Sequence, residues 1–196
     1  MPIPVDCRRL DAFDPSFLVM TTPRLVLRPM LAPDVDGFVE LAKEEGRTAE
    51  ALPNRADLEA MRQTFTEEWQ QHGFGYLMMF ERESRYLAGN VRLKPFPLPN
   101  GRGAEITYSV DGPFRNKGYA TEAAAASLLL AFDIAGVDHA LACIEPENTA
   151  SHKVVAKLGF VSIAEGRVHG IKMRRYLLNR PAWQGKPRSE EHTSEL

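Results

Sequence analysis

The sequence predicts one α/β domain, in which short strands alternate with helices around a single core. Three observations lead to this prediction. Segments with alternating apolar residues interleave with segments of helical periodicity along most of the chain. The length of 196 residues suits one domain. No internal repeat, linker or low-complexity segment divides the chain.

The first half of the chain predicts a strand, two helices and three further strands. Alternation around Leu25 and Leu27, between two prolines, predicts the first strand over 24–28. Helical spacing predicts one helix that opens at Pro33, and a second that has Asn54 as its N-cap and ends near Gly73. Apolar or alternating runs predict strands over 76–80, 87–93 and 104–110, with a loop at Pro95, Pro97, Pro99, Asn100 and Gly101.

The second half predicts a buried helix, a short strand, a short helix and two closing strands. Residues 118–135 are nearly apolar all round, which is typical of a buried helix, and Gly136 ends it. A strand over 139–144 and a helix over 148–158 follow, and strands over 161–164 and 172–178 close the domain. The predicted order is therefore β-α-α-β-β-β-α-β-α-β-β.

Composition excludes several classes of function. The 24 Lys and Arg residues nearly balance the 26 Asp and Glu residues, which argues against a nucleic-acid-binding protein. No apolar run is long enough to span a membrane and no secretory signal opens the chain, so we expect a cytoplasmic protein. Two cysteines make neither a disulfide framework nor a zinc site. No metal is expected, because the histidines lack metal-ligand spacing: His139, His152 and His169.

The two ends of the chain differ from the predicted domain, which we place at residues 20–187. Residues 1–19 contain three prolines and no periodicity, which indicates either a disordered arm or a start assigned upstream of Met20. Residues 188–196, RSEEHTSEL, resemble the in-frame translation of a sequencing adapter. These nine residues hold one Arg and three Glu, which accounts for the whole formal net charge of −2.

The stretch from Arg115 to Glu122, RNKGYATE, is the strongest candidate for a binding site. Gly118 allows a tight turn, and the helix that follows presents free N–H groups and the positive end of its dipole. Such a helix start binds phosphate well, and Arg115 and Lys117 would add positive charge. The alternative is an ordinary strand–loop–helix joint with solvated basic residues.

Residues 115–123 resemble the acyl-coenzyme A pyrophosphate motif of the GNAT superfamily of N-acetyltransferases. The segment from Asn148 to Phe160, with Ser151, Val154 and Lys157 at the matching positions, is similar to the second cofactor motif of that family. The opening residues 22–29, TPRLVLRP, resemble the first strand of the branch that acetylates N-terminal alanine or serine of ribosomal proteins. The three motifs occur in the expected order over residues 20–180.

The resemblance implies a central, mixed and mostly antiparallel sheet that is flanked by about four helices. Strands 104–110 and 139–144 would splay apart at the cofactor site, and the cofactor would be acetyl-CoA, acting as a co-substrate. The pyrophosphate would cap the helix, the pantetheine arm would bind backbone near Val110 and the side chain of Asn148, and the thiol would lie near Ser151. The implied cofactor-binding residues are Val110, Arg115, Asn116, Lys117, Gly118, Tyr119, Ala120, Thr121, Asn148 and Ser151. A plain N-cap is the alternative role for Asn148.

Acetyl transfer to an amine requires a base for the amine and a proton for the leaving thiolate. Glu105 is the predicted base, because the family often carries a glutamate on this strand; a solvated surface carboxylate is the alternative. The tyrosine that the family often uses as an acid would fall at Val155, which cannot donate a proton. Ser151 and Tyr108 are the remaining donors. Cys143, on an apolar strand, is predicted to be a small buried hydrophobe and not a nucleophile.

We therefore expect an acetyl-CoA-dependent N-acetyltransferase that transfers acetyl directly to a primary amine, such as a protein or peptide N-terminus. Residues 47–55 and 165–171 would form the acceptor walls, and they carry no distinctive pattern. Two alternatives remain: an acetyltransferase for an amino acid, polyamine or aminoglycoside, and a catalytically weak acyl-CoA sensor. The expected partners are acetyl-CoA and the amine acceptor, without nucleic acid or membrane, and we expect a monomer or a homodimer.

Overall fold

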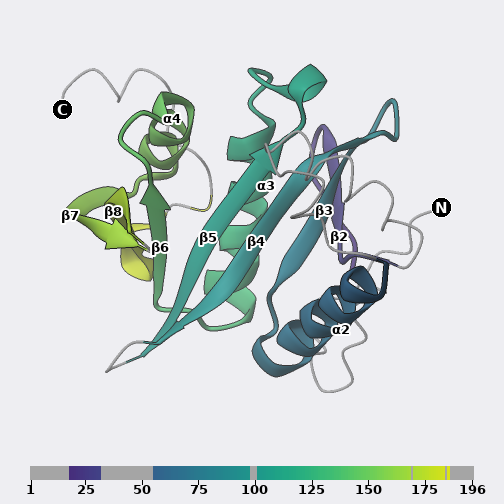
Figure 1. Ribbon diagram of the computed structural model, residues 1–196, viewed down its shortest axis with the longest axis horizontal. Coiled ribbons are helices and arrows are strands. Elements are labelled where there is room, and N and C mark those ends of the chain that lie inside the picture. Colours follow the sequence, from purple (N-terminus) through teal and green to yellow (C-terminus); the bar gives the residue numbers. More distant parts are fainter. Residues whose placement is uncertain (1–17, 32–54, 98–100, 169, 184, 186–196) are drawn as a thin grey trace.

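The computed structural model describes residues 18–31, 55–97, 101–168, 170–183 and 185 (Figure 1). The described strands form one sheet of eight, in the order β1-β2-β3-β4-β5-β6-β8-β7. The strands are β1 Met20–Thr21, β2 Leu25–Arg28, β3 Tyr76–Glu81, β4 Leu87–Pro97, β5 Arg102–Val110, β6 His139–Ile144, β7 Val161–Val168 and β8 Ile171–Asn179. The helices are α2 Arg55–His72, α3 Tyr119–Leu129 and α4 Thr149–Leu158.

This architecture confirms the predicted α/β class and the mixed, mostly antiparallel sheet. Among the described strands, β5 and β6 are the one parallel pair, and the other neighbours run antiparallel. A parallel pair needs a crossover, and α3 supplies it on the rear face of the sheet in Figure 1. Several predictions lie outside the described residues, namely the helix from Pro33, the Asn54 N-cap, residues 1–17 and residues 188–196.

Two apolar clusters hold the helices against opposite faces of the sheet. The larger cluster joins α3 and α4 to one face and includes Ala123, Leu128, Val155 and Ile106, all nearly inaccessible to solvent. Ala123 and Ala124 are fully buried, and their small side chains let the α3 backbone approach the sheet closely. The smaller cluster lies under α2, in front of the sheet in Figure 1. There the ring of Phe65 on α2 stacks on the ring of Tyr76 on β3.

The predicted loop at Pro95 and Pro97 was wrong, because β4 continues as a strand through both prolines and pairs with β5. Leu93 donates its N–H to the carbonyl of Gly75, on the side of β4 that faces β3. Backbone N–H groups alternate in direction along a strand, so the nitrogens of Pro95 and Pro97 face the same side. β3 begins only at Tyr76, so none of the described strands covers that side of β4 beyond Arg92. The missing N–H of each proline therefore removes no hydrogen bond of the sheet.

The last two strands form a longer hairpin than the sequence predicted. Because β7 ends at Val168 and β8 begins at Ile171, most of the predicted acceptor wall at 165–171 belongs to the hairpin itself. His169 lies outside the described residues. None of the helices in the described ranges is long and apolar enough to cross a membrane.

Candidate active site

The parallel pair β5 and β6 separates after three residues. The two strands are paired only at positions 103–105 of β5 and 139–141 of β6. Beyond Glu105, β5 continues to Val110 and β6 to Ile144 without pairing to each other. The predicted splay between these two strands is therefore present, and it leaves strand edges that can accept an extended ligand.

A cavity of about 610 Å³ lies beside this split, between the end of β5, the start of α3 and one face of α4. Its volume falls within the range of small-molecule sites. Every predicted cofactor-binding residue except Lys117 lines it, together with the predicted donor Tyr108. The full lining is Tyr108, Ser109, Val110, Phe114, Arg115, Asn116, Gly118, Tyr119, Ala120, Thr121, Asn148, Ala150, Ser151, Lys153, Val154 and Lys157.

The loop before α3 bends so that the helix start faces the cavity. Asn116 and Gly118 have positive φ angles of 61° and 80°, and Gly118 is the N-cap of α3. The first helical hydrogen bond is donated by Glu122 to the carbonyl of Gly118. The N–H groups of residues 119–121, which precede it, therefore have no acceptor within the helix and are available to an anion.

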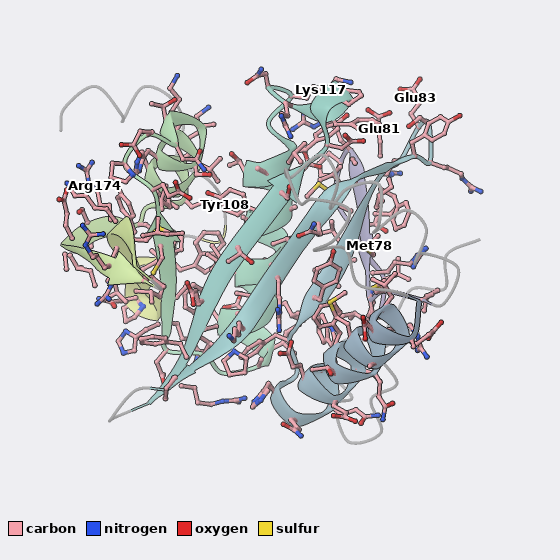
Figure 2. The ribbon with its side chains drawn as sticks, viewed as in Figure 1. Met78, Glu81, Glu83, Tyr108, Lys117 and Arg174 are labelled. Atoms are coloured by element: carbon pink, nitrogen blue, oxygen red, sulfur yellow. The ribbon has the colours of Figure 1, made fainter. Side chains whose placement is uncertain are left out.

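Polar contacts from β3 hold the same loop from the outside. The hydroxyl of Tyr119 donates to the Glu81 carboxylate over 2.5 Å, and this hydrogen bond raises the pKa of Tyr119. Figure 2 shows Lys117 beside Glu81, and its Nζ lies 3.9 Å from Glu81 Oε1 and 5.1 Å from the centre of the Phe114 ring. The structure thus directs the Lys117 ammonium toward β3, outside the cavity lining, although the sequence suggested a place near the anion.

Arg115 lies in the cavity lining and holds the end of β5. Its Nε donates to the carbonyl of Val110 over 2.8 Å, next to the split. The backbone at Val110, where the resemblance implies pantetheine binding, is thereby fixed beside the cavity. Two lysines of α4, Lys153 and Lys157, line another wall of the cavity.

The start of α4 brings the second predicted motif to the cavity. The Asn148 side chain accepts a hydrogen bond from the Ser151 N–H over 3.0 Å, so Asn148 is the N-cap of α4 and also lines the cavity. The hydroxyl of Tyr108 donates to the Ser151 carbonyl over 3.3 Å, and burial raises the pKa of Tyr108 to about 12. Both predicted donors therefore lie together, and the Tyr108 phenol keeps its proton throughout the neutral range.

Glu105 lies at the closed end of the split, on the face of the sheet opposite the cavity. Its neighbours Ala104 and Ile106 point into the core under α3, and side chains alternate along a strand. The half-buried Glu105 side chain accepts a hydrogen bond from the thiol of Cys143 on β6. Burial and the Glu105 charge raise the pKa of Cys143 to about 11, so this thiol is protonated at neutral pH.

The side chains that the sequence analysis excluded as proton donor or metal ligands are packed in the core or hydrogen-bonded. Val155 is fully buried in the core and supplies no proton donor. The ring nitrogens of His152 contact the Tyr176 hydroxyl and two backbone carbonyls, and His139 contacts Asn179. Among the residues that the structure describes, no three His, Cys, Asp or Glu side chains gather where they could hold a metal ion.

One anchoring contact was not predicted from the sequence. Arg24 on the N-terminal side of β2 pairs with Glu122 in the first turn of α3 at 2.7 Å. Burial alone would raise the pKa of Glu122, but hydrogen bonds from Thr22 and Arg24 lower it, so the carboxylate is ionised at neutral pH. Arg24 belongs to the motif of residues 22–29 and Glu122 to the RNKGYATE stretch, and nothing in the sequence indicates that these two segments are in contact.

The fold and the cavity together define an α/β domain with a small-molecule site beside a split in its sheet. The family model for the acetyltransferase (GNAT) domain matches residues 24–161. This chain belongs to that family, whose members use acetyl-CoA.

Solved structures support the fold assignment. The ribosomal-protein-S5-alanine acetyltransferase from Vibrio fischeri superposes with a TM-score of 0.69 at 17% identity, over 85% of this chain and 99% of that chain. RimL, a ribosomal L7/L12 α-N-protein acetyltransferase solved with coenzyme A, gives 0.69 at 16% identity, over 83% and 98%. A GNAT-family acetyltransferase from Bacillus anthracis gives 0.67 at 19% identity, over 84% and 99%.

Proposed function

We propose that this protein is an acetyl-CoA-dependent N-acetyltransferase that transfers acetyl directly to a primary amine, with a peptide or protein N-terminus as the acceptor. The observation that carries the proposal is the position of the two cofactor motifs and Glu105 around one split in the sheet. The motifs surround the cavity on one face, and the carboxylate lies at the closed end of the split on the other face. Cofactor and acceptor can therefore approach the split from opposite sides.

The cavity suits coenzyme A. The free N–H groups of residues 119–121 would hold the pyrophosphate, with Arg115 beside them. The edge of β5 at Val110 and the side chain of Asn148 would hold the pantetheine amides. Acetyl-CoA would supply the acetyl group as a thioester, which is activated toward attack by an amine.

In this proposal Glu105 takes the proton from the attacking amine, directly or through a water molecule. A carboxylate is a suitable base here, because the amine must be neutral to attack and a positioned base contributes typically 10²–10⁴-fold to a rate. The new bond joins the amine nitrogen to the acetyl carbon, the carbon–sulfur bond breaks, and the sulfur leaves as a thiolate that takes up a proton.

Ser151 and Tyr108 are the proposed partners of the leaving sulfur. A phenol with a pKa of about 12 is a poor acid toward a thiolate, whose conjugate acid has a pKa of about 8.5. Full proton transfer from Tyr108 would cost about 5 kcal/mol. Tyr108 and Ser151 therefore stabilise the thiolate by hydrogen bonding, and solvent supplies the proton. The high pKa of Cys143 also favours direct transfer over an acetyl-cysteine intermediate.

The acceptor class rests on two likenesses. The residues 22–29 resemble the first strand of the branch that acetylates ribosomal-protein N-termini, and two of the structural neighbours are named as acetyltransferases of ribosomal proteins. A peptide N-terminus is also neutral more often than a lysine side chain at pH 7, because its pKa is near 8 and that of lysine is near 10.4.

The proposal is tested by measuring free-thiol release from acetyl-CoA with a panel of acceptors. The panel contains peptides that begin with Ala or Ser, the same peptides with a blocked N-terminus, free amino acids, a polyamine and an aminoglycoside. We expect release with the free N-terminal peptides and none with the blocked ones, and mass spectrometry should find the acetyl group on the N-terminal amine. Release only with a small amine would establish the small-molecule alternative. Binding of acetyl-CoA without release for any acceptor would establish the sensor alternative.

A further inference from the structure

We propose that Arg24 and Glu122 are positioning residues, which fix the loop of residues 115–119 to β2 in the conformation that binds the coenzyme A phosphates. The proposal rests on the proposed function, since that function assigns the phosphates to this loop. Cofactor affinity would then also depend on Arg24, immediately before β2, although neither Arg24 nor β2 lines the cavity.

The Glu122 carboxylate is held on both oxygens by residues that lie close together between β1 and β2. Its Oε1 accepts from the backbone N–H of Arg24 over 2.8 Å and from the hydroxyl of Thr22 over 2.5 Å. Its Oε2 accepts from Arg24 Nε over 2.7 Å. The first turn of α3 is thereby tied to a segment about a hundred positions earlier in the chain.

The same guanidinium also holds the loop itself. Arg24 Nη1 donates to the carbonyl of Lys117 over 2.5 Å, and the guanidinium lies 4.9 Å from the centre of the Tyr119 ring. A Cβ atom built on Gly118 would lie 3.2 Å from Arg24 Nη2. Arg24 therefore packs against three consecutive residues of the loop on the side away from the cavity.

Energetics distinguish positioning from simple stabilisation. The Arg24 side chain is 49% exposed, and an ion pair on an exposed side chain contributes only about 0–1 kcal/mol to stability. The Glu122 side chain is only 13% exposed, but it keeps the Thr22 hydroxyl and the Arg24 N–H as partners when the guanidinium is removed. The loop, however, holds Asn116 at a φ angle of 61°, an uncommon conformation for a residue with a side chain, which persists where its surroundings enforce it. Removing the pair should therefore alter the loop geometry, and with it phosphate binding, more than the stability of the fold.

The test compares Arg24→Met and Glu122→Gln with Arg62→Met. Arg62 forms a surface ion pair with Glu59 on α2 at 2.9 Å, and it lies outside the cavity lining and the predicted acceptor walls. We measure the affinity for coenzyme A by calorimetry, thermal stability, and kcat and KM with acetyl-CoA. We also measure kcat/KM with acetyl-pantetheine, which lacks the pyrophosphate.

We expect Arg24→Met to weaken coenzyme A binding and raise KM for acetyl-CoA about tenfold, because small misplacement of a binding group has effects of this size. Glu122→Gln should act in the same direction, while kcat and the reaction with acetyl-pantetheine change less than about threefold. The Arg62 variant should match the wild type. Unchanged affinity in both variants, or equal losses with acetyl-CoA and acetyl-pantetheine, would overturn the inference. If the wild type binds coenzyme A but transfers no acetyl group, the proposed activity fails, and the calorimetric comparison still decides the role of Arg24.

Discussion

Replacing Gly118 by valine will weaken coenzyme A binding by at least about a hundredfold. Gly118 has a φ angle of 80°, a conformation that costs a residue with a side chain roughly 1–2 kcal/mol and a β-branched residue more. The new side chain would also crowd Arg24 and push the loop away from the free N–H groups of α3. Losing two hydrogen bonds to a phosphate, at about 1.5–3 kcal/mol each, accounts for the expected loss.

The matched control for this variant is Gly136→Val. Gly136 has a similar φ angle of 68°, ends the helical segment that α3 begins, and has no atom within 4 Å of the position that a Cβ would occupy. It therefore carries the same backbone strain outside the cavity lining. Calorimetric titration with coenzyme A should give wild-type affinity for Gly136→Val. Wild-type affinity for Gly118→Val as well would mean that the phosphates do not bind at this loop.

Replacing Glu105 by glutamine will lower kcat by about 10²–10³-fold, because glutamine cannot accept the proton of the amine. The affinity for acetyl-CoA should stay within about twofold, since Glu105 lies on the opposite face of the sheet from the cavity. Glutamine keeps the size of the side chain and can still accept a hydrogen bond from Cys143. Steady-state kinetics with the best acceptor of the panel gives both constants.

The control for Glu105→Gln is Glu83→Gln. Glu83 is an exposed carboxylate in the turn between β3 and β4, and Figure 2 shows it on the opposite side of the view from Arg174. That variant should keep the wild-type kcat. If Glu105→Gln also kept it, another group or solvent would have to deprotonate the amine, and Glu105 would be the solvated carboxylate that the sequence left as an alternative.

Local patterns predicted most of the described fold. Apolar patterns predicted α2, α3 and α4, and apolar or alternating runs predicted every described strand except the two-residue β1, because burial leaves a pattern in the sequence. The two prolines in β4 misled this reasoning, since a proline ends a strand only where its N–H position faces another strand. That condition depends on where β3 begins, and β3 lies earlier in the chain.

The candidate site was predictable to the extent that it follows from short motifs. The residues that approach the cavity from α3 and α4 stand at fixed spacings from a helix start, so the sequence predicted them together. The direction of a long side chain was not predictable, and Lys117 turns to Glu81 instead of the cavity. The pairing of Arg24 with Glu122 depends on the order of strands in the sheet, which the spacing of residues within either motif does not encode.

A crystal structure of the protein with coenzyme A would show whether the cavity beside the β5–β6 split is the acetyl-CoA site. We expect the pyrophosphate within hydrogen-bond distance of the N–H groups of residues 119–121, and the pantetheine arm between Val110 and Asn148. We also expect the sulfur beside Ser151, at the end of the split that leads to Glu105. Coenzyme A bound elsewhere, with this cavity occupied only by solvent, would show that the cavity is not the acetyl-CoA site.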